Sequence, residues 1–149
     1  MFESVEATVE HAHAVAPLMR KADLAELAAS GSEPLESLLR GIRDSVYCRT
    51  LLADGVPAMI WGVTQLTDTV WSPWALGTDA INNDRRGFMV FSREELDRVA
   101  AQYPVLFNHV DARNATAIRW LQWLGFDVMD PEPIGVDGAP FHPFILRAA

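Results

Sequence analysis

The chain has 149 residues, half of them apolar and 21% charged, and this length and composition predict one globular domain over residues 1–149. Twenty acidic residues against twelve basic ones give a net charge of -8, which excludes a nucleic-acid-binding surface because phosphate contacts need clustered Lys and Arg. A single cysteine, Cys48, an amino-terminal sequence without a basic or long apolar region, and the lack of a membrane-length apolar run predict a cytoplasmic protein.

The first third of the chain predicts one strand and two helices. Apolar and polar residues alternate over residues 5–10, and this period of two predicts a first strand. A helix with one apolar face follows and ends near the acidic stretch 23–27. Gly31 and Pro34 interrupt the chain, and leucines at helical spacing over residues 35–42 predict the second helix.

The middle of the chain predicts three strands. Residues 46–52 and 56–63 read as strands around the Asp-Gly pair at 54–55, a pair typical of a two-residue hairpin turn. Residues 69–76 are rich in β-branched and aromatic side chains and predict a further strand, in which Pro73 indicates an edge or a bulge.

The last third predicts two helices and three strands. Residues 81–102 read as one long helix and 105–110 as a short strand, after which Asn114 begins a helix that Gly125 stops. A final strand pair follows, over residues 126–129 and 141–146. The resulting order, β-α-α-β-β-β-α-β-α-β-β, predicts a mixed α/β (α+β) domain with a largely antiparallel central sheet and helices on its faces.

Three stretches of the chain resemble a known superfamily. Residues 114–126 have an Asn after a strand, an Ala three positions later, an apolar helix and then Gly-Phe, which is similar to a motif of the GNAT superfamily of acetyl-CoA-dependent N-acyltransferases. Pro-Trp-Ala-Leu-Gly-Thr at 73–78 and Phe-His-Pro-Phe at 141–144, with the pattern over residues 20–27, resemble a narrower group, the phage GNAT-like proteins known as internal virion protein A.

The resemblance implies where acetyl-CoA would bind. The sheet is expected to splay between the strands at 69–76 and 105–110, and the pantetheine arm to lie in that gap. The next helix would offer its amino-terminal amides to the pyrophosphate near residues 83–87. The residues that the resemblance assigns to acetyl-CoA are Leu76, Gly77, Arg85, Arg86, Gly87, Asn114 and Arg119.

Two departures from the superfamily pattern predict that acetyl-CoA binding is weak or lost. Asp84 stands where the phosphate loop begins with Arg or Gln, and Met89 stands where it ends with Gly or Ala, so a negative charge and a bulky side chain replace phosphate-binding features. Arg85 and Arg86 compensate in part. Leu121, seven positions after Asn114, replaces the Tyr that often protonates the departing thiolate, and leucine cannot donate a proton.

Several candidate residues also have ordinary structural interpretations. Asn114 is among the best helix caps, a role that is compatible with cofactor binding, and an exposed Arg119 is typical of a solvated helix face. No catalytic residue is assigned; His109 is the one candidate base, with a half-buried strand residue as the favoured alternative. No His has Cys or carboxylate partners at metal-ligand spacing, so no metal site is predicted. Trp120 and Trp123, three apart on one helix, favour an exposed aromatic surface for a protein partner.

Three hypotheses about function follow. The first is a phage-type GNAT-fold protein of the virion or its assembly, which acts through protein contacts with its acyltransferase activity lost or vestigial. The second is a working N-acetyltransferase that acts on an amine, and the third is an acyl-CoA-binding regulatory module. The two departures favour the first, with a virion or assembly component as partner and a homo-oligomer as an alternative. Its expected location is the host cytoplasm or the virion, without nucleic-acid or membrane contacts.

Overall fold

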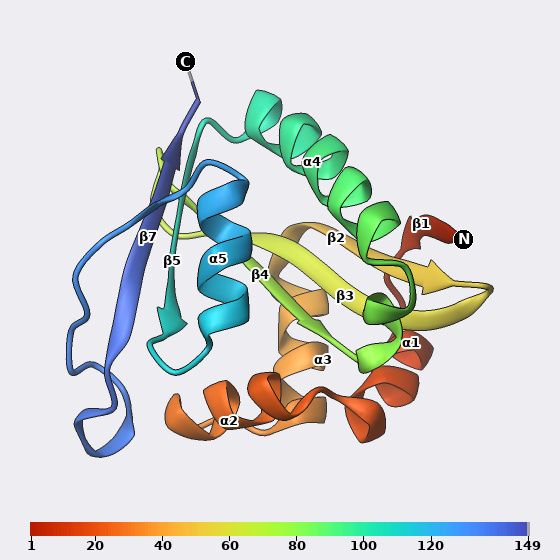
Figure 1. Ribbon diagram of the computed structural model, residues 1–149, viewed down its shortest axis with the longest axis horizontal. Helices are drawn as coiled ribbons and strands as arrows, with labels where there is room; N and C mark the ends of the chain where they lie inside the picture. Colours follow the sequence, from red (N-terminus) through yellow and green to blue (C-terminus); the bar gives the residue numbers. More distant parts are fainter. Residues whose placement is uncertain (149) are drawn as a thin grey trace.

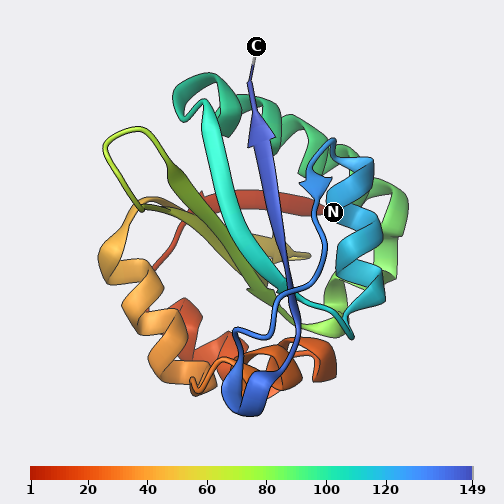
Figure 2. The same ribbon diagram turned by 90° about the vertical axis from the view of Figure 1, so that its left-hand side faces the viewer.

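The computed structural model describes residues 1–148, which form one mixed sheet of seven strands in the order β1-β2-β3-β4-β5-β7-β6. The elements in chain order are β1 (Phe2–Glu6), α1 (Val9–Val15), the 3₁₀ helix η1 (Ala16–Leu18), α2 (Lys21–Ala29), α3 (Pro34–Asp44), β2 (Ser45–Ala53), β3 (Val56–Gln65), β4 (Trp71–Gly77), the 3₁₀ helix η2 (Asp79–Asp84), α4 (Arg85–Gln102), β5 (Val105–Asp111), α5 (Ala115–Trp123), β6 (Asp127–Val128), the 3₁₀ helix η3 (Val136–Gly138) and β7 (Phe141–Arg147). Helices α1 to α3 lie on one side of the sheet, and α4 and α5 lie on the other (Figures 1 and 2).

The hairpin of β2 and β3 confirms the prediction made from the Asp-Gly pair. Ala53 pairs with Val56, and the two residues between them have positive φ, 50° at Asp54 and 81° at Gly55. A two-residue turn of this kind needs left-handed backbone at both positions, which glycine adopts without strain and aspartate tolerates. The turn fixes the register of the two longest strands.

The amino-terminal third differs from the prediction in two places. The first strand ends at Glu6, because Thr8 caps α1: the Thr8 hydroxyl accepts from the His11 N–H at 3.3 Å and the Thr8 N–H donates to His11 Nδ1 at 3.1 Å. Val9, expected in the strand, therefore begins a helix. Pro17 lies in the first turn of η1, so the single helix expected before residue 31 is divided into α1, η1 and α2.

The carboxyl-terminal half follows the prediction more closely. The helix expected over 81–102 is divided into η2 and α4, and the strand expected at 126–129 is reduced to the two residues of β6. Asn114 caps α5, with its Oδ1 accepting from the Ala117 N–H at 3.2 Å, and Gly125 ends the helix with φ of 100°.

Strands β4 and β5 run parallel and are paired at one end only. Their only registered pair is Trp71 with Leu106, whereas β4 pairs with β3 over all seven of its residues. Pro73, expected at an edge or a bulge, is instead in an interior strand. The Pro73 C=O accepts a hydrogen bond from Asn108 Nδ2 on β5 at 2.7 Å, so it faces the gap. The backbone N and O of one strand residue point to the same side of the strand. The N–H that proline lacks would have faced the gap, so the ladder with β3 loses nothing.

Three hydrophobic clusters hold the helices against the sheet, one of them around Leu51, Met59 and Ile81 beneath η2 and the first half of α4. A second packs α4 and α5 on the sheet through residues that include Leu106, Val110 and Leu121. The third packs α1 and α3 on the opposite face around Leu38 and Ile60, both fully buried. A side chain of this size contributes about 1.5–3 kcal/mol when it is fully buried. Within residues 1–148, no helix has the length and apolarity that crossing a membrane requires.

Candidate functional site

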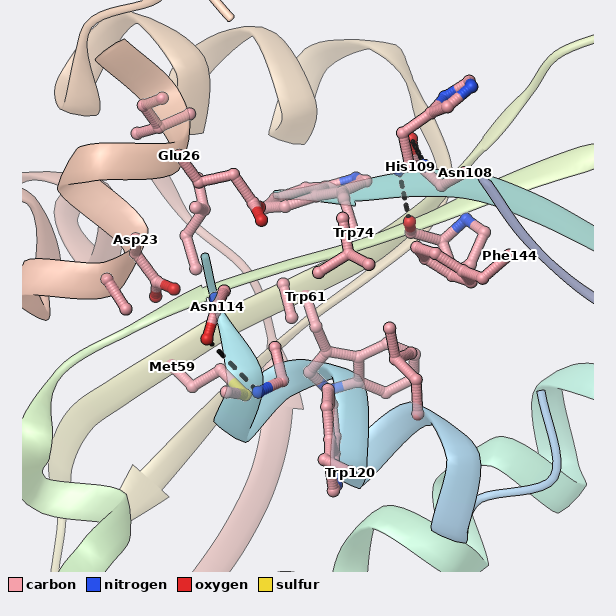
Figure 3. A pocket seen from close by; sticks show the side chains of 18 of the residues that line it. Asp23, Glu26, Met59, Trp61, Trp74, Asn108, His109, Asn114, Trp120 and Phe144 are labelled. Carbon is pink, nitrogen blue, oxygen red and sulfur yellow. Dashed lines mark hydrogen bonds between the residues drawn. The ribbon is translucent and has the colours of Figure 1, made fainter. Parts of the chain in front are cut away.

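A cavity of about 1020 Å³ occupies the gap between β4 and β5. Its walls come from α2 and α3 on one face of the sheet, from β3, β4 and β5, and from α4 and α5 on the other face, so it joins the two faces. Figure 3 shows Trp61, Trp74, Trp120 and Phe144 in these walls, with the acidic side chains of α2 at one side. The gap is therefore a largely apolar chamber with a few charged groups.

Helix α2 lies near the carboxyl ends of β4 and β5 (Figure 1), and its side chains bond to both strands. The Gly77 N–H at the end of β4 donates to Asp23 Oδ2 at 2.8 Å, and the Asp111 N–H at the end of β5 donates to Glu26 Oε1 at 2.8 Å. Positions three apart on a helix lie on one face, so both carboxylates point toward the strands. Arg20 pairs with Asp23 at 2.9 Å, which leaves Glu26 as the unpaired acid of the two.

The environment of Glu26 raises its pKa from 4.5 to about 7. Burial is the main cause, because it disfavours the charged form, and the neighbouring carboxylates of Asp23 and Asp111 act in the same direction. The hydrogen bond from the Asp111 N–H and the charge of Arg20 oppose the shift without cancelling it. The Asp111 carboxyl has a lowered pKa, because it accepts hydrogen bonds from Arg113. Glu26 is thus a carboxyl group at this site whose pKa lies near neutral pH.

Unused polar atoms gather around the cavity. Among the described residues, the buried side-chain atoms without a hydrogen-bond partner are Ser37 Oγ, Trp61 Nε1 and Trp120 Nε1. All three residues line the cavity. Because buried polar groups normally have partners, each of these three atoms is a candidate for a hydrogen bond to a bound water or ligand.

No protein-family model and no curated protein matches the sequence. Solved structures match it closely in shape. The yncA protein of Salmonella typhimurium, described as a putative acetyltransferase with its cofactor acetyl-CoA, superposes with a TM-score of 0.73 at 16% identity, over 100% of this chain and 95% of that one. The ribosomal-protein-S18-alanine N-acetyltransferase of Escherichia coli gives 0.69 at 14% identity, over 100% and 95%. A GNAT-family acetyltransferase of Bacillus anthracis gives 0.73 at 8% identity, over 98% and 94%.

This chain has the GNAT fold. The expected fold class is confirmed, including the splayed sheet, while the narrower likeness to phage proteins stays a prediction. The parallel pair β4 and β5, open beyond one registered pair, is the feature that the sequence resemblance placed between residues 69–76 and 105–110.

One amide among the residues assigned to the pyrophosphate is bound to a side chain of the chain itself. The Gly87 N–H donates to Asp84 Oδ1 at 2.9 Å, and a Cβ at Gly87 would collide with the Asp84 carboxylate. Arg85 and Arg86 are exposed and lie outside the cavity lining, as does Arg119 on α5. Binding of a pyrophosphate by these residues stays a prediction.

Of the remaining predicted residues, Leu76, Asn114 and His109 line the cavity, and Gly77 lies outside its lining. Leu76 is a buried part of the wall, but the neighbouring Gly77 N–H is already bound to Asp23. Asn114 both caps α5 and borders the cavity, so its two predicted roles are compatible. The half-buried ring of His109 lies edge-on to Phe107 at 5.1 Å between ring centroids, and its backbone N–H donates to Asn108 Oδ1 (Figure 3).

Sequence reasoning missed the acidic residues of the site. Asp23 and Glu26 were noted for their likeness to a phage pattern and not as site residues. Their spacing of three on a helix was the available pattern, but the sequence did not show which strands that helix face meets. Glu95 on α4 is a further acid in the wall, buried like Asp23, and it is neutralised by Arg98 at 2.8 Å.

Proposed function

We propose that this protein is an N-acyltransferase that moves an acyl group from a thioester to an amine, with Glu26 as the general base. The observation that carries the proposal is the position of Glu26: it reaches the wall of the β4–β5 cavity, and its pKa is about 7. A base with a pKa near the working pH combines a useful ionised fraction with good proton affinity. His109 also lines this cavity and is the alternative base.

The chemistry needs one proton transfer to the protein. The amine nitrogen attacks the thioester carbonyl carbon, so a C–N bond forms as the C–S bond breaks, and the amine proton passes to the Glu26 carboxylate. The thiolate leaves and takes its proton from water, because Leu121 stands where a side-chain donor would be expected. Glu26 then returns its proton to solvent.

The cavity fits the arm of an acyl donor better than it fits a nucleotide. Apolar walls suit a pantetheine-type chain, and the unpartnered indole N–H groups of Trp61 and Trp120 are donors suited to its amide carbonyls. Asp84, in contrast, lies on the amide that a pyrophosphate would use. We therefore expect the pantetheine arm of acetyl-CoA to fit the cavity, and its phosphates to lack a matching site at the start of α4.

The proposal predicts acyl transfer by the purified chain, with a defined pH dependence. Thiol release from an acetyl thioester should depend on a primary amine acceptor. At subsaturating acceptor, the rate should rise through pH 7 as Glu26 loses its proton, because only the ionised carboxylate accepts one. The measurement is thiol release over pH 5.5–8.5 with a panel of amines, including peptide amino termini. No release above the uncatalysed rate with any acceptor would contradict the proposal.

A second candidate function is the phage-type one, action through protein contacts with catalysis lost. The specific observation in its favour is the Asp84 carboxylate on the Gly87 amide, which works against tight acetyl-CoA binding. A second is Trp123, whose exposed fraction is 48%. This hypothesis places the protein in the host cytoplasm or the virion, with an assembly component or a second copy of the chain as partner.

Trp123→Ala tests that candidate. The Trp123 ring lies 4.7 Å from the Arg93 guanidinium and packs little against the core, so we expect its loss to change the free energy of unfolding by about 1 kcal/mol or less. If Trp123 faces a second copy of the chain, the variant should also sediment as a smaller species than the parent. The control is Trp120→Ala, which removes a ring stacked on Phe88 and should cost about 3–5 kcal/mol. Identical sedimentation of parent and Trp123→Ala would argue against self-association through this surface.

A further inference from the structure

The amino terminus of α4 is occupied by the chain itself. Asp84 bonds to the Gly87 N–H, and its carboxylate lies so close to the glycine that a Cβ there would displace the Asp84 side chain. Asn is the only side chain that could keep this capping bond at residue 84 with nearly the same shape and no charge. The Gly87 N–H, which the resemblance assigns to the pyrophosphate, is therefore already bound to the Asp84 carboxylate.

The residues before Asp84 are helical. Helix α4 continues directly from the 3₁₀ helix η2, so the connection between β4 and α4 is a helical segment and not an extended loop. The N–H of Ala80, the second residue of η2, is bound to Thr78 Oγ1 at 3.3 Å. Two backbone amides of this connection, those of Ala80 and Gly87, thus already have side-chain acceptors of the chain.

The negative charge of Asp84 also disfavours an anion at the start of α4. An anion at the start of α4 would meet the Asp84 carboxylate at close range, and like charges at such a distance repel even near a protein surface. Arg85 and Arg86 are exposed, and neither is directed into the cavity wall. A pyrophosphate would thus have to displace a capping carboxylate before it gained any backbone hydrogen bond.

We propose, on the basis of the acyltransferase function above, that the donor is recognised through a pantetheine-type arm alone and that Asp84 excludes the pyrophosphate of a nucleotide. The donor class is an acyl thioester on such an arm, for which the nucleotide half of coenzyme A adds no binding. Asp84 is then a specificity-determining residue.

The test compares donors that differ only in the nucleotide half. For the parent chain, kcat/KM should be equal within about threefold for acetyl-CoA and S-acetylpantetheine, and millimolar adenosine 3′,5′-bisphosphate should not inhibit. Asp84→Asn removes the charge and keeps the cap. It should raise the acetyl-CoA to S-acetylpantetheine ratio by roughly 2- to 5-fold, the usual range for one charge at a helix terminus. The control is Asp97→Asn, the same charge change at an exposed position of α4, which should leave the ratio unchanged.

Calorimetry with coenzyme A and with pantetheine gives a second readout that does not need turnover. Equal affinities for the parent, and a gain for coenzyme A alone in Asp84→Asn, support the proposal. A parent preference for coenzyme A or acetyl-CoA above tenfold, or an unchanged ratio in Asp84→Asn, overturns it. Turnover of neither donor refutes the acyltransferase function, and the binding ratio then still decides whether Asp84 excludes the nucleotide.

Discussion

Glu26→Gln should lower acyl transfer at pH 8 by about 10²–10⁴-fold, the usual contribution of a general base. Gln keeps an oxygen that can accept from the Asp111 N–H, so the link between α2 and β5 is retained while the base is removed. The rise of the rate through pH 7 should disappear together with the activity. Both are measured as kcat/KM for the amine over pH 5.5–8.5.

Glu36→Gln on α3 is the matched control, because Glu36 is exposed and lies outside the cavity. It should leave the rate and its pH profile unchanged. Retention of a pH profile with a midpoint near 7 in Glu26→Gln would assign the titrating group elsewhere and remove Glu26 from the mechanism.

The same substitution should stabilise the protein at alkaline pH. The Glu26 pKa is about 7 in the folded chain against an ordinary value of 4.5, so between these pH values the folded state binds the extra proton. The stability that comes from this proton is complete below pH 4.5 and is lost as the pH rises through 7. Gln avoids the loss, and 2.5 pKa units correspond to at most about 3 kcal/mol in favour of the variant at pH 8.5. At pH 4 the two proteins should unfold alike in urea.

Asp23→Ala should lower the free energy of unfolding by about 3–5 kcal/mol, the range for breaking a buried ion pair. The side chain of Asp23 is 4% exposed and accepts from Arg20 and from the Gly77 N–H. Alanine leaves the guanidinium without its partner and the amide at the end of β4 without an acceptor. Urea unfolding monitored by tryptophan fluorescence measures the difference.

Two further variants separate the buried pair from ordinary surface electrostatics. Asp23→Asn keeps an acceptor for the Gly77 N–H and should cost less than Asp23→Ala. Asp44→Ala breaks the Arg43–Asp44 pair, in which both side chains are about half exposed or more, and should cost about 0–1 kcal/mol. An Asp23→Ala variant as stable as Asp44→Ala would show that α2 does not depend on this carboxylate.

Local patterns predicted the elements that depend on local chemistry. The Asp-Gly turn at 54–55 requires positive φ at both residues, and Asn114 with Gly125 marks the two ends of α5, so these features could be located from the sequence. The first strand was placed too late, because Thr8 and His11 form a capping box that a period-two pattern does not reveal.

The chemistry of the site depends on contacts that are distant in sequence, and these the sequence did not show. Glu26 acquires its pKa because α2 packs at the end of β5, 85 residues away along the chain. The sequence indicated that Asp84 and Met89 depart from the phosphate-loop pattern, but not that Asp84 turns back onto Gly87. It also directed attention to His109, because no local pattern indicated which acid would be buried.

The bond from each strand end to α2 has a consequence for how a ligand enters. One turn of a rigid helix holds β4 through Asp23 and β5 through Glu26, so α2 works as a spacer that sets the separation of the two strands before any ligand arrives. If β4 and β5 were paired along their whole length, each binding event would have to break backbone hydrogen bonds between them. Here the separation of the two strands is set during folding, and a ligand that entered the gap would break no β4–β5 pairing beyond that of Trp71 with Leu106.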